Sequence, residues 1–238
     1  MFNVLCRLYL NVGSMRAKFF IFSIAFFSFC CNAKESTDAV YADYTITAEE
    51  ETENCTCLLK FHQRSSQGAT LFLEPPAAVS LDGAALQGDS AGLSGAYYEA
   101  QKPLAQFAGA HTIVFKNSDG NEYSEAFTFQ PFTITTELDE QVPRGDIALP
   151  VSGLASNQPI RVLLTDTSFV TADINEIDTV KNGQLLITRA ALRNVASGPV
   201  TLHLYKEEER RLQHPPAGGG KLSITYGLSR EFELVDEY

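Results

Sequence analysis

The sequence predicts an all-β protein, built from two tandem antiparallel β-sandwiches that follow an N-terminal signal segment. Short segments of alternating apolar residues recur about every ten residues, separated by glycine, proline and Asp-Gly turns, as all-β proteins require. No apolar pattern of helical period persists beyond residue 34. A further pattern occurs twice: Gly109 precedes the alternating residues 111–115, and Gly198 precedes residues 200–204. The distance between the two glycines matches the length of one small β-sandwich.

The clearest hairpin lies in residues 109–129, GAHTIVFKNSDGNEYSEAFTF. Ile113 and Phe115 alternate with more polar neighbours before the turn, and apolar residues alternate again after it. Alternation on both sides of an Asp-Gly turn is a strong short-range signal for a β-hairpin. This hairpin is expected to close the first sandwich near Pro131.

The remaining segments of the first half follow in order. Strands are expected at residues 44–48, 55–62, 69–73 and 97–98, and an Asp82-Gly83 turn is expected to join residues 79–81 to 84–86. Residues 88–95 are predicted to be a loop of small residues. The acidic run at residues 49–53 is interpreted as a solvated turn, because adjacent carboxylates alone do not define a cation site.

The second half is expected to begin at Phe132 with almost no linker, which favours two sandwiches placed end to end. Its strands are expected at residues 132–138, 147–151, 160–165, 185–188, 200–205, 222–226 and 231–235. Residues 169–180 are predicted to be irregular, 190–195 a helical turn, 206–211 a charged strand extension and 213–220 a loop. The predicted organisation is therefore a signal peptide at 1–33, a tether at 34–41, and sandwiches at 42–131 and 132–238.

The N-terminus has the features of an export signal. Arg16 and Lys18 precede the apolar stretch FFIFSIAFFSFCC, which falls within the roughly 7–15 residues of a secretory signal core. The chain then becomes polar. Met15, directly before Arg16, is an alternative start of the protein.

Two cleavage sites fit this signal. The Cys30-Cys31 pair resembles the end of a bacterial lipoprotein signal, in which a lipidated cysteine becomes the mature N-terminus. In that family a small residue directly precedes the lipidated cysteine. Cys31 follows the small Cys30, whereas Cys30 follows Phe29, so Cys31 is the better candidate and Cys30 the alternative. A lipid on Cys31 would hold the protein at a membrane surface. Ordinary cleavage after Ala33 would instead give a periplasmic or secreted protein.

The formal net charge of −11 argues against nucleic-acid binding. Removal of the signal segment would make the chain still more acidic, because that segment carries Arg7, Arg16 and Lys18 and no acid. Such a surface repels a phosphate backbone.

The Gly109 and Gly198 patterns resemble the turn into the penultimate strand of immunoglobulin-like domains, where a tyrosine commonly forms a corner hydrogen bond. His111 and Val200 stand at the tyrosine position, so the corner bond is not expected in either half. The chain also lacks tryptophan and a cysteine pair spaced to bridge two sheets. Together with the signal, this looks like an exported bacterial lipoprotein with tandem immunoglobulin-like domains. Such domains serve as adhesins, spacers, carbohydrate-binding partners of enzymes and assembly factors.

One motif suggests catalysis. The stretch Gly88-Asp-Ser90-Ala-Gly92 matches G-x-S-x-G, the nucleophile pattern of lipases and esterases. That chemistry needs the serine on a strained turn between a strand and a helix. No helix is expected after Ser90, so a serine hydrolase is the less favoured alternative.

Three motifs partly match metal or phosphate sites. Cys55 and Cys57 share one face of the predicted strand and His62 faces the other, so one metal ion cannot readily bind all three. Both cysteines are expected to be buried and apolar, with a link to another cysteine or chain left open. The turn at residues 117–122 lacks the spacing of a calcium loop. The Gly218–Lys221 stretch (GGGK) lacks the remaining residues of a phosphate loop.

Neither a metal nor a cofactor is therefore expected, and no catalytic set is coherent. The sequence favours a non-catalytic exported envelope protein, lipid-anchored through Cys31, that acts in binding, adhesion or spacing. Its expected partner is an unknown envelope protein or glycan. A carbohydrate-binding accessory protein is the alternative, for which an exposed Tyr97 or Tyr98 would be the marker.

Overall fold

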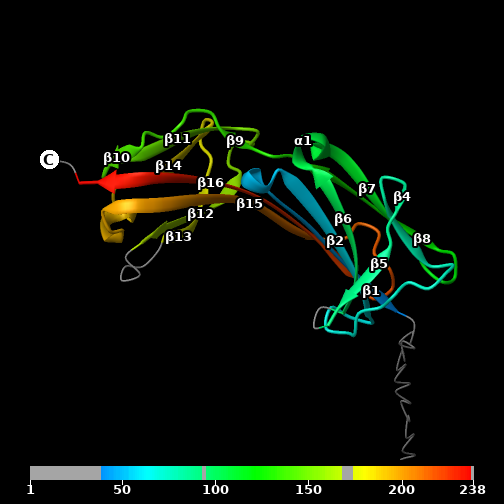
Figure 1. Cartoon of the computed structure of the whole chain (residues 1–238). Coiled ribbons are helices and arrows are strands. Elements are labelled where there is room, and N and C mark those ends of the chain that lie inside the picture. The colour runs from blue at the N-terminus through cyan, green and yellow to red at the C-terminus, as the bar shows by residue number, and fades with distance from the viewer. Residues whose placement is uncertain (1–38, 93–94, 168–173, 237–238) are drawn as a thin grey trace, which may run out of the picture. The chain divides into compact units, whose positions relative to one another are not determined.

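The computed structural model describes residues 39–92, 95–167 and 174–236, all within one compact unit, Glu35–Tyr238. The described chain is an all-β protein, as the sequence predicts (Figure 1). The predicted signal segment, with Cys30 and Cys31, lies outside the described residues. Among those that are described, no helix has the length and apolar character needed to cross a membrane.

The strands and short helices occur in the following order. They are β1 Val40–Glu49, η1 Glu50–Thr52, β2 Asn54–Gln63, β3 Ala78–Leu81, β4 Ala84–Ala85, β5 Gly88–Ala91, β6 Gly95–Pro103, α1 Leu104–Phe107, β7 Gly109–Lys116, β8 Glu122–Phe129, β9 Thr133–Ile134, β10 Gln141–Pro143, β11 Ile147–Ser152, β12 Pro159–Asp166, β13 Ile174–Thr179, β14 Gln184–Ile187, η2 Ala191–Asn194, β15 Gly198–Arg211 and β16 Gly220–Val235. The predicted hairpins at Asp82-Gly83 and at residues 109–129 are both confirmed.

The first half forms a β-sandwich. One layer has the strand order β1-β2-β6-β5 and the other β4-β3-β7-β8. The order matches the A-B-E-D and C-F-G layers of an immunoglobulin-like sandwich, with β4 as an added strand beside β3. The layers meet through aromatic side chains: the ring centroids of Phe61 on β2 and Phe115 on β7 lie 4.5 Å apart.

The second half repeats this plan. Strands β13-β12-β15-β16 form one layer and β14-β11-β9 the other. β10 pairs in parallel with the end of β16. The two glycines of the repeated pattern occupy equivalent places: Gly109 begins β7 after α1, and Gly198 begins β15 after η2. Both have positive φ, 129° and 121°, which a residue with a side chain rarely adopts.

The β15–β16 hairpin belongs to both halves. β15 has 14 residues and β16 has 16, and both strands run through one continuous nine-stranded sheet (Figure 1). Beyond the second sandwich, Gly220 to Gly227 of β16 pair in parallel with Ala42 to Glu49 of β1. The sequence predicts two separate strands here, at residues 222–226 and 231–235, whereas the structure has one. The predicted domain boundary at residues 131–132 stays a prediction, but this hairpin adds a strand to the first-half sheet.

A buried ion pair fixes the end of this hairpin to the first half. Glu125 on β8 is 2% exposed, and Arg210 on β15 forms an ion pair with it. Arg210 Nη2 also donates to the backbone oxygen of Ala126 at 2.9 Å. The second oxygen of Glu125 accepts a hydrogen bond from the Gln213 backbone N–H at 2.7 Å. Both carboxylate oxygens of Glu125 are therefore satisfied by residues of the hairpin.

The sequence predicts that the acidic run at residues 49–53 is a solvated turn. In the structure, two of its carboxylates bind residues of β16. Glu50 forms an ion pair with Arg230 of β16 at 2.6 Å, and Glu51 accepts a hydrogen bond from Ser229. Tyr226 lies nearby between Phe129 and Phe132, with ring centroids 6.0 and 5.4 Å away. The turn therefore docks onto β16, because the folded chain places Arg230 and Ser229 opposite the carboxylates.

A corner hydrogen bond does form in the first half, although the sequence does not predict it. His111 Nε2 donates to the backbone oxygen of Phe107 at 2.7 Å, and the two rings stack with centroids 3.9 Å apart. His111 Nδ1 donates to Asp82 at 2.8 Å. Both ring nitrogens of His111 therefore have a hydrogen-bond partner in this arrangement. Histidine thus performs here the role that tyrosine has in related sandwiches.

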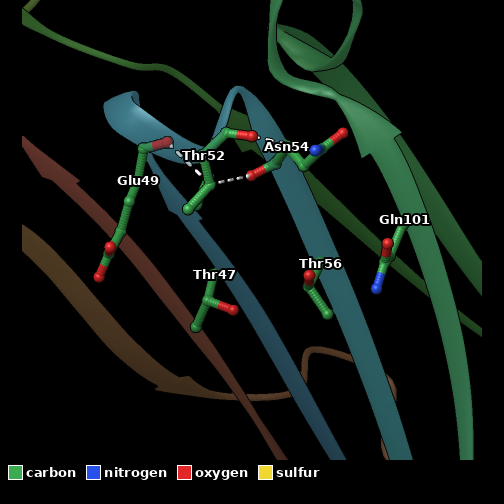
Figure 2. A pocket seen from close by; sticks show the side chains of 7 residues that line it. Thr47, Glu49, Thr52, Asn54, Thr56 and Gln101 are labelled. Carbon is green, nitrogen blue, oxygen red and sulfur yellow. Dashed lines mark hydrogen bonds between the residues drawn. The ribbon is translucent and has the colours of Figure 1, made fainter.

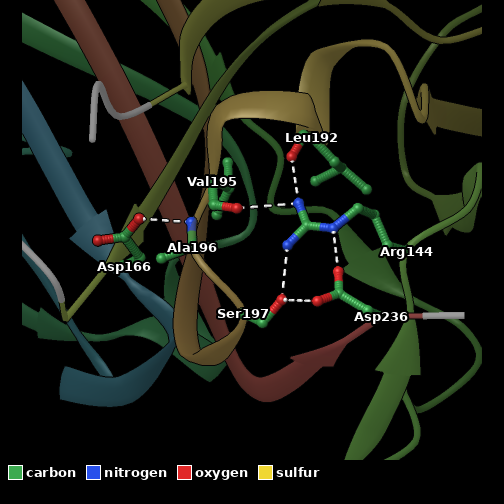
Figure 3. A network of polar contacts seen from close by, with 7 residues as sticks. All are labelled: Arg144, Asp166, Leu192, Val195, Ala196, Ser197 and Asp236. Atoms are coloured by element: carbon green, nitrogen blue, oxygen red, sulfur yellow. Dashed lines mark hydrogen bonds and ion pairs between the residues drawn. The ribbon is translucent and has the colours of Figure 1, made fainter. Parts of the chain in front are cut away.

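In the second half, an arginine replaces the tyrosine corner. Val200 occupies the tyrosine position, but Arg144 extends into the η2 turn and donates to the backbone oxygens of Leu192 and Val195 (Figure 3). Its guanidinium also contacts Asp236 and Ser197, each at 2.8 Å. Since Arg144 lies far from the turn in sequence, no local pattern indicates this role.

We expect Asp82 to make the protein sensitive to acid. Burial acts to raise its pKa, but hydrogen bonds from His111 and Thr112 outweigh burial and lower the pKa below its ordinary value. Stability from Asp82 is therefore complete above the unfolded-state pKa of about 3.9 and is lost as the pH falls through the lower folded-state value. Urea unfolding of the wild type should weaken more steeply below about pH 4 than unfolding of Asp82→Asn. Parallel pH profiles would contradict this.

Two expected strands are reduced: residues 69–73 have only an isolated bridge, between Thr70 and His62, and residues 132–138 have only β9. Two other segments contain a strand that the sequence does not predict. Residues 88–91 form strand β5 and not the predicted loop. Their small side chains have little tendency to form a strand, but the segment pairs with β6. Residues 174–179 form β13 within a segment predicted to be irregular, and pair with β12. In both cases, strand pairing outweighs a weak local pattern. The predicted helical turn before Gly198 is present as η2.

Candidate functional site

Ser90 lies within a strand and not on a nucleophile turn. β5 is exposed at all four residues and pairs with β6. Among the described residues, the hydrogen bonds of this strand join the Ser90 N–H to Asp89 at 2.7 Å, and none joins Ser90 to a histidine. The G-x-S-x-G match therefore lacks the strand-to-helix turn that the hydrolase motif requires.

Cys55 and Cys57 lie side by side in the core of the first sandwich. Both are buried, 0% exposed, with free thiols, as the strand parity predicts. The hydrogen bond between the Cys57 thiol and Cys55, together with burial, raises the pKa of the Cys57 thiol. Across the described ranges, no group of three or more His, Cys, Asp or Glu side chains is arranged to hold a metal ion.

Neither cysteine is expected to react in the native protein. The thiolate is the nucleophile, and the raised pKa of Cys57 disfavours it, while burial excludes the reagent from both sulfurs. Iodoacetamide at neutral pH should leave residues 55–57 unmodified in the folded chain and alkylate both cysteines in urea, as read by peptide mass spectrometry. Equal labelling in both states would contradict this assignment.

The other residues that the sequence singles out make contacts within the fold. Asn117 Oδ1 accepts hydrogen bonds from the N–H groups of Asp119 and Asn121, at 3.1 and 2.9 Å, which shapes the hairpin turn. Tyr98 is in the core, 4% exposed, and Tyr97 faces outward and bonds to Asp89. In the glycine loop, Gly218 N–H donates to Val40 and Lys221 pairs with Glu209.

A polar hollow lies on the outer face of the nine-stranded sheet, the face turned away from the core (Figure 2). Its volume is about 350 Å³, and its lining comes from β1, β2, β6 and the η1 turn. The lining residues are Thr47, Ala48, Glu49, Thr52, Asn54, Thr56 and Gln101. Thr52 Oγ1 donates to the Glu49 and Asn54 backbone oxygens, at 3.1 and 3.3 Å, which fixes one rim.

A second hollow adjoins the first, and Glu49 lines both. It has a volume of about 140 Å³ and contains residues of both halves: Glu49, Glu50, Glu51, His203, Tyr205, Gly227, Leu228 and Ser229. The rings of His203 and Tyr205 are nearly parallel, with an interplanar angle of 9° and centroids 6.1 Å apart. We call the two hollows together the junction face.

The junction face carries uncompensated negative charge. Burial and the charges of Glu49, Glu51 and Glu207 raise the pKa of Tyr205, so its hydroxyl keeps its proton and can donate at neutral pH. The neighbouring cations are already paired: Arg230 with Glu50, and Arg161 with Glu207. No ion pair within the described part of the chain involves Glu49, which leaves its charge facing solvent.

Sequence reasoning did not single out this face. Alternation indicates correctly that Thr47, Thr56 and His203 point outward. The grouping of these residues depends on the register between β1, β2, β16 and β15, which local patterns do not encode. The available signal was a threonine at an outward position in each of three strands, Thr47, Thr56 and Thr225.

Comparisons with known proteins give a weak likeness in structure. No family model matches the chain, and no curated protein matches it. A solved structure of Dpr11 IG1 bound to DIP-gamma aligns with a TM-score of 0.24 and 10% identity, over 83% of this chain and 96% of that one. A 1.5-MDa bacterial ice-binding adhesin aligns with a TM-score of 0.22 and 13% identity, over 83% and 66%.

A third solved structure is the Bacteroides ovatus protein SGBP-B, in complex with a mixed-linkage heptasaccharide. It aligns with a TM-score of 0.21 and 9% identity, over 79% of this chain and 61% of that one. Likeness at this level supports no inference about function. The strand order of the two sandwiches is what defines the chain as an all-β protein with immunoglobulin-like layers.

Proposed function

We propose that this chain is an exported, non-catalytic binding module of the cell envelope, and that the junction face binds its ligand. The observation that carries this proposal is the meeting of two hollows at Glu49, with lining residues from both halves. Ligand sites favour such concave places between structural units. Export and an anchor at Cys31 belong to the proposal and rest on the sequence of the signal segment.

The absence of catalysis is also part of the proposal. Its support is the position of Ser90 within exposed strand β5, where the motif lacks its turn. A fluorophosphonate probe tests it directly: the wild type should stay unlabelled. Labelling that disappears in Ser90→Ala would favour the serine-hydrolase alternative.

A carbohydrate-binding accessory protein is the second candidate. The parallel rings of His203 and Tyr205 favour it, because an aromatic surface beside hydrogen-bonding side chains suits a sugar. Of the two tyrosines expected as a marker, Tyr98 is buried and Tyr97 faces outward beside Asp89, and the His203–Tyr205 pair is a second aromatic surface on the same sheet. A protein of the envelope remains the other partner class.

The test uses labelled mature protein on the surface of intact host cells. Thr56→Arg places a long cation inside the larger hollow and should reduce binding at least tenfold. Thr201→Arg is the matched control, since Thr201 is also half-buried on β15 of the same sheet but lies outside both hollows. Equal binding by the wild type and Thr56→Arg would show that the junction face is not the site.

The anchor is tested separately by intact mass. A diacylglyceryl-modified N-terminal Cys31 in the membrane fraction would support the lipoprotein. A soluble chain beginning at Lys34 would show ordinary cleavage after Ala33 and a diffusible protein.

A further inference from the structure

We propose that the junction face binds a linear, uncharged glycan whose chain runs across the strands, with its units over successive strands from β15 toward β6. This inference rests on the proposed function and names the ligand class for the same face. Its basis is a row of hydroxyl and amide side chains at strand spacing, beside two parallel aromatic rings.

The row follows from the register of four neighbouring strands. Thr225 on β16 is opposite Thr47 on β1, Thr47 is opposite Thr56 on β2, and Thr56 is opposite Gln101 on β6. Neighbouring strands lie about 4.8 Å apart, so the row presents a hydrogen-bonding side chain at each such interval. An extended polysaccharide likewise presents hydroxyl groups at regular intervals along its length. The row therefore suits a repeating polyhydroxylated chain.

The aromatic rings lie beside this row, one side-chain position further along the strands, because the residue opposite Thr225 at the β15 end of the row is Glu207. Tyr205 on β15 is opposite Gly227 on β16, and Gly227 is opposite Glu49 on β1. A Cβ on Gly227 would lie 2.7 Å from Tyr205 Cε1, so the glycine is what allows the ring to lean over β16. His203 continues the aromatic surface along the strand. Apolar sugar faces pack on aromatic rings, while Glu49 can accept from sugar hydroxyls.

The backbone argues against a polypeptide ligand added as a strand. β16, β1 and β2 each have a paired strand on both sides, so their N–H and C=O groups are already used within the sheet. Strand addition needs a free sheet edge. Recognition on this face must therefore use side chains, and the available ones are hydroxyls, amides, two rings and carboxylates.

The negative charge of the junction face favours neutral glycans over polyanionic ones. Glu49 and Glu51 have no basic partner among the described residues, while Arg161 and Arg230 are neutralised by Glu207 and Glu50. A polyanionic chain, such as alginate or polygalacturonate, would be repelled by this arrangement. The geometry points to a neutral polymer.

The experiment is affinity gel electrophoresis of the full mature chain with soluble glycans. The neutral probes are mixed-linkage β-glucan, xyloglucan, arabinoxylan, galactomannan and dextran, and the polyanions are alginate and polygalacturonate. We expect retardation by at least one neutral glycan and by neither polyanion. The triple variant Thr47→Val/Thr56→Val/Thr225→Val removes the hydroxyls with little change of shape and should weaken binding at least tenfold.

Two tyrosine variants provide a matched comparison. Tyr205→Ala should weaken binding at least tenfold, whereas Tyr97→Ala, on the same face but two side-chain positions beyond Gln101 on β6, should not. Thermal unfolding of every variant confirms that it is folded. Retardation by no neutral glycan, preference for a polyanion, or unchanged binding by the triple variant would overturn the inference. If the glycans fail but Thr56→Arg still loses cell binding, the proposed binding face stands with a different ligand.

Discussion

A fragment that contains only residues 39–131 is expected to be unfolded or aggregated, although this range is the predicted first sandwich. The fragment lacks Gly220 to Gly227 of β16, which pair with β1 in the whole chain. Its β1 edge would present unpaired backbone groups, a recognised cause of aggregation. Its β8 edge would lose Arg210, leaving Glu125 buried without a cation.

β16 adds three buried side chains to the first sandwich. Leu222 is 0% exposed, Ile224 8% and Tyr226 3%. Burial of one such side chain contributes about 2 kcal/mol, while a whole domain is stable by only about 5–15 kcal/mol. Loss of all three contacts therefore removes much of the stability available to the first half.

Circular dichroism and amide NMR dispersion of the fragment test this expectation. A point variant of the whole chain adds a finer test: Leu222→Ala should destabilise by about 2–5 kcal/mol and speed hydrogen exchange in β2, within the first half. Ser223→Ala, on the opposite face of the same strand, is the control and should leave exchange in β2 unchanged. A fragment that melts cooperatively with a dispersed spectrum would establish residue 131 as an independent domain boundary.

Local patterns in the sequence predicted much of the fold. Alternation placed Cys55 and Cys57 in the core, and the Asp-Gly turns placed two hairpins. These features depend on neighbouring residues alone, since side chains alternate along a strand and turn geometry is local. The positions of the glycines before β7 and β15 likewise reflect a local need for positive φ.

The parts that the sequence did not predict depend on contacts between distant residues. Ser229 and Glu51 are 178 positions apart, and Arg144 and Leu192 are 48 apart. No alternation or turn rule relates such residues. The junction face is of the same kind, because Thr47 and Thr225 become neighbours only through the parallel register of β1 with β16. The sequence can predict that a threonine faces outward, but it cannot predict which threonines of neighbouring strands lie opposite one another.

Arg210→Ala is expected to destabilise the protein by about 3–5 kcal/mol, because it would leave the buried Glu125 carboxylate without its cation. Glu125 is 2% exposed, and the Arg210 side chain is 27% exposed. The charge of Glu125 also acts on the core: together with burial, the dominant cause, it raises the pKa of Tyr44. Urea unfolding at neutral pH measures the loss.

The neighbouring residue supplies a matched control. Arg211 is exposed on the same strand, and the described contacts include no ion pair for it, so Arg211→Ala should change stability by less than about 0.5 kcal/mol. Both variants remove one positive charge from the same hairpin. A difference between them therefore reports the buried contact and not the net charge of the chain.

The double variant Arg210→Met/Glu125→Leu separates two explanations of a large loss. If the loss in Arg210→Ala comes from the uncompensated Glu125 charge, removing both charged groups should recover most of the stability, since apolar replacement of a buried pair is often nearly neutral. If the ion pair itself supplies the stability, the double variant should be as unstable as the single one. The Gln213 N–H would lose its acceptor in the double variant, so we expect recovery to fall short of the wild type by about 1 kcal/mol. Equal stability of Arg210→Ala and Arg211→Ala would instead show that the hairpin is held to β8 without this ion pair.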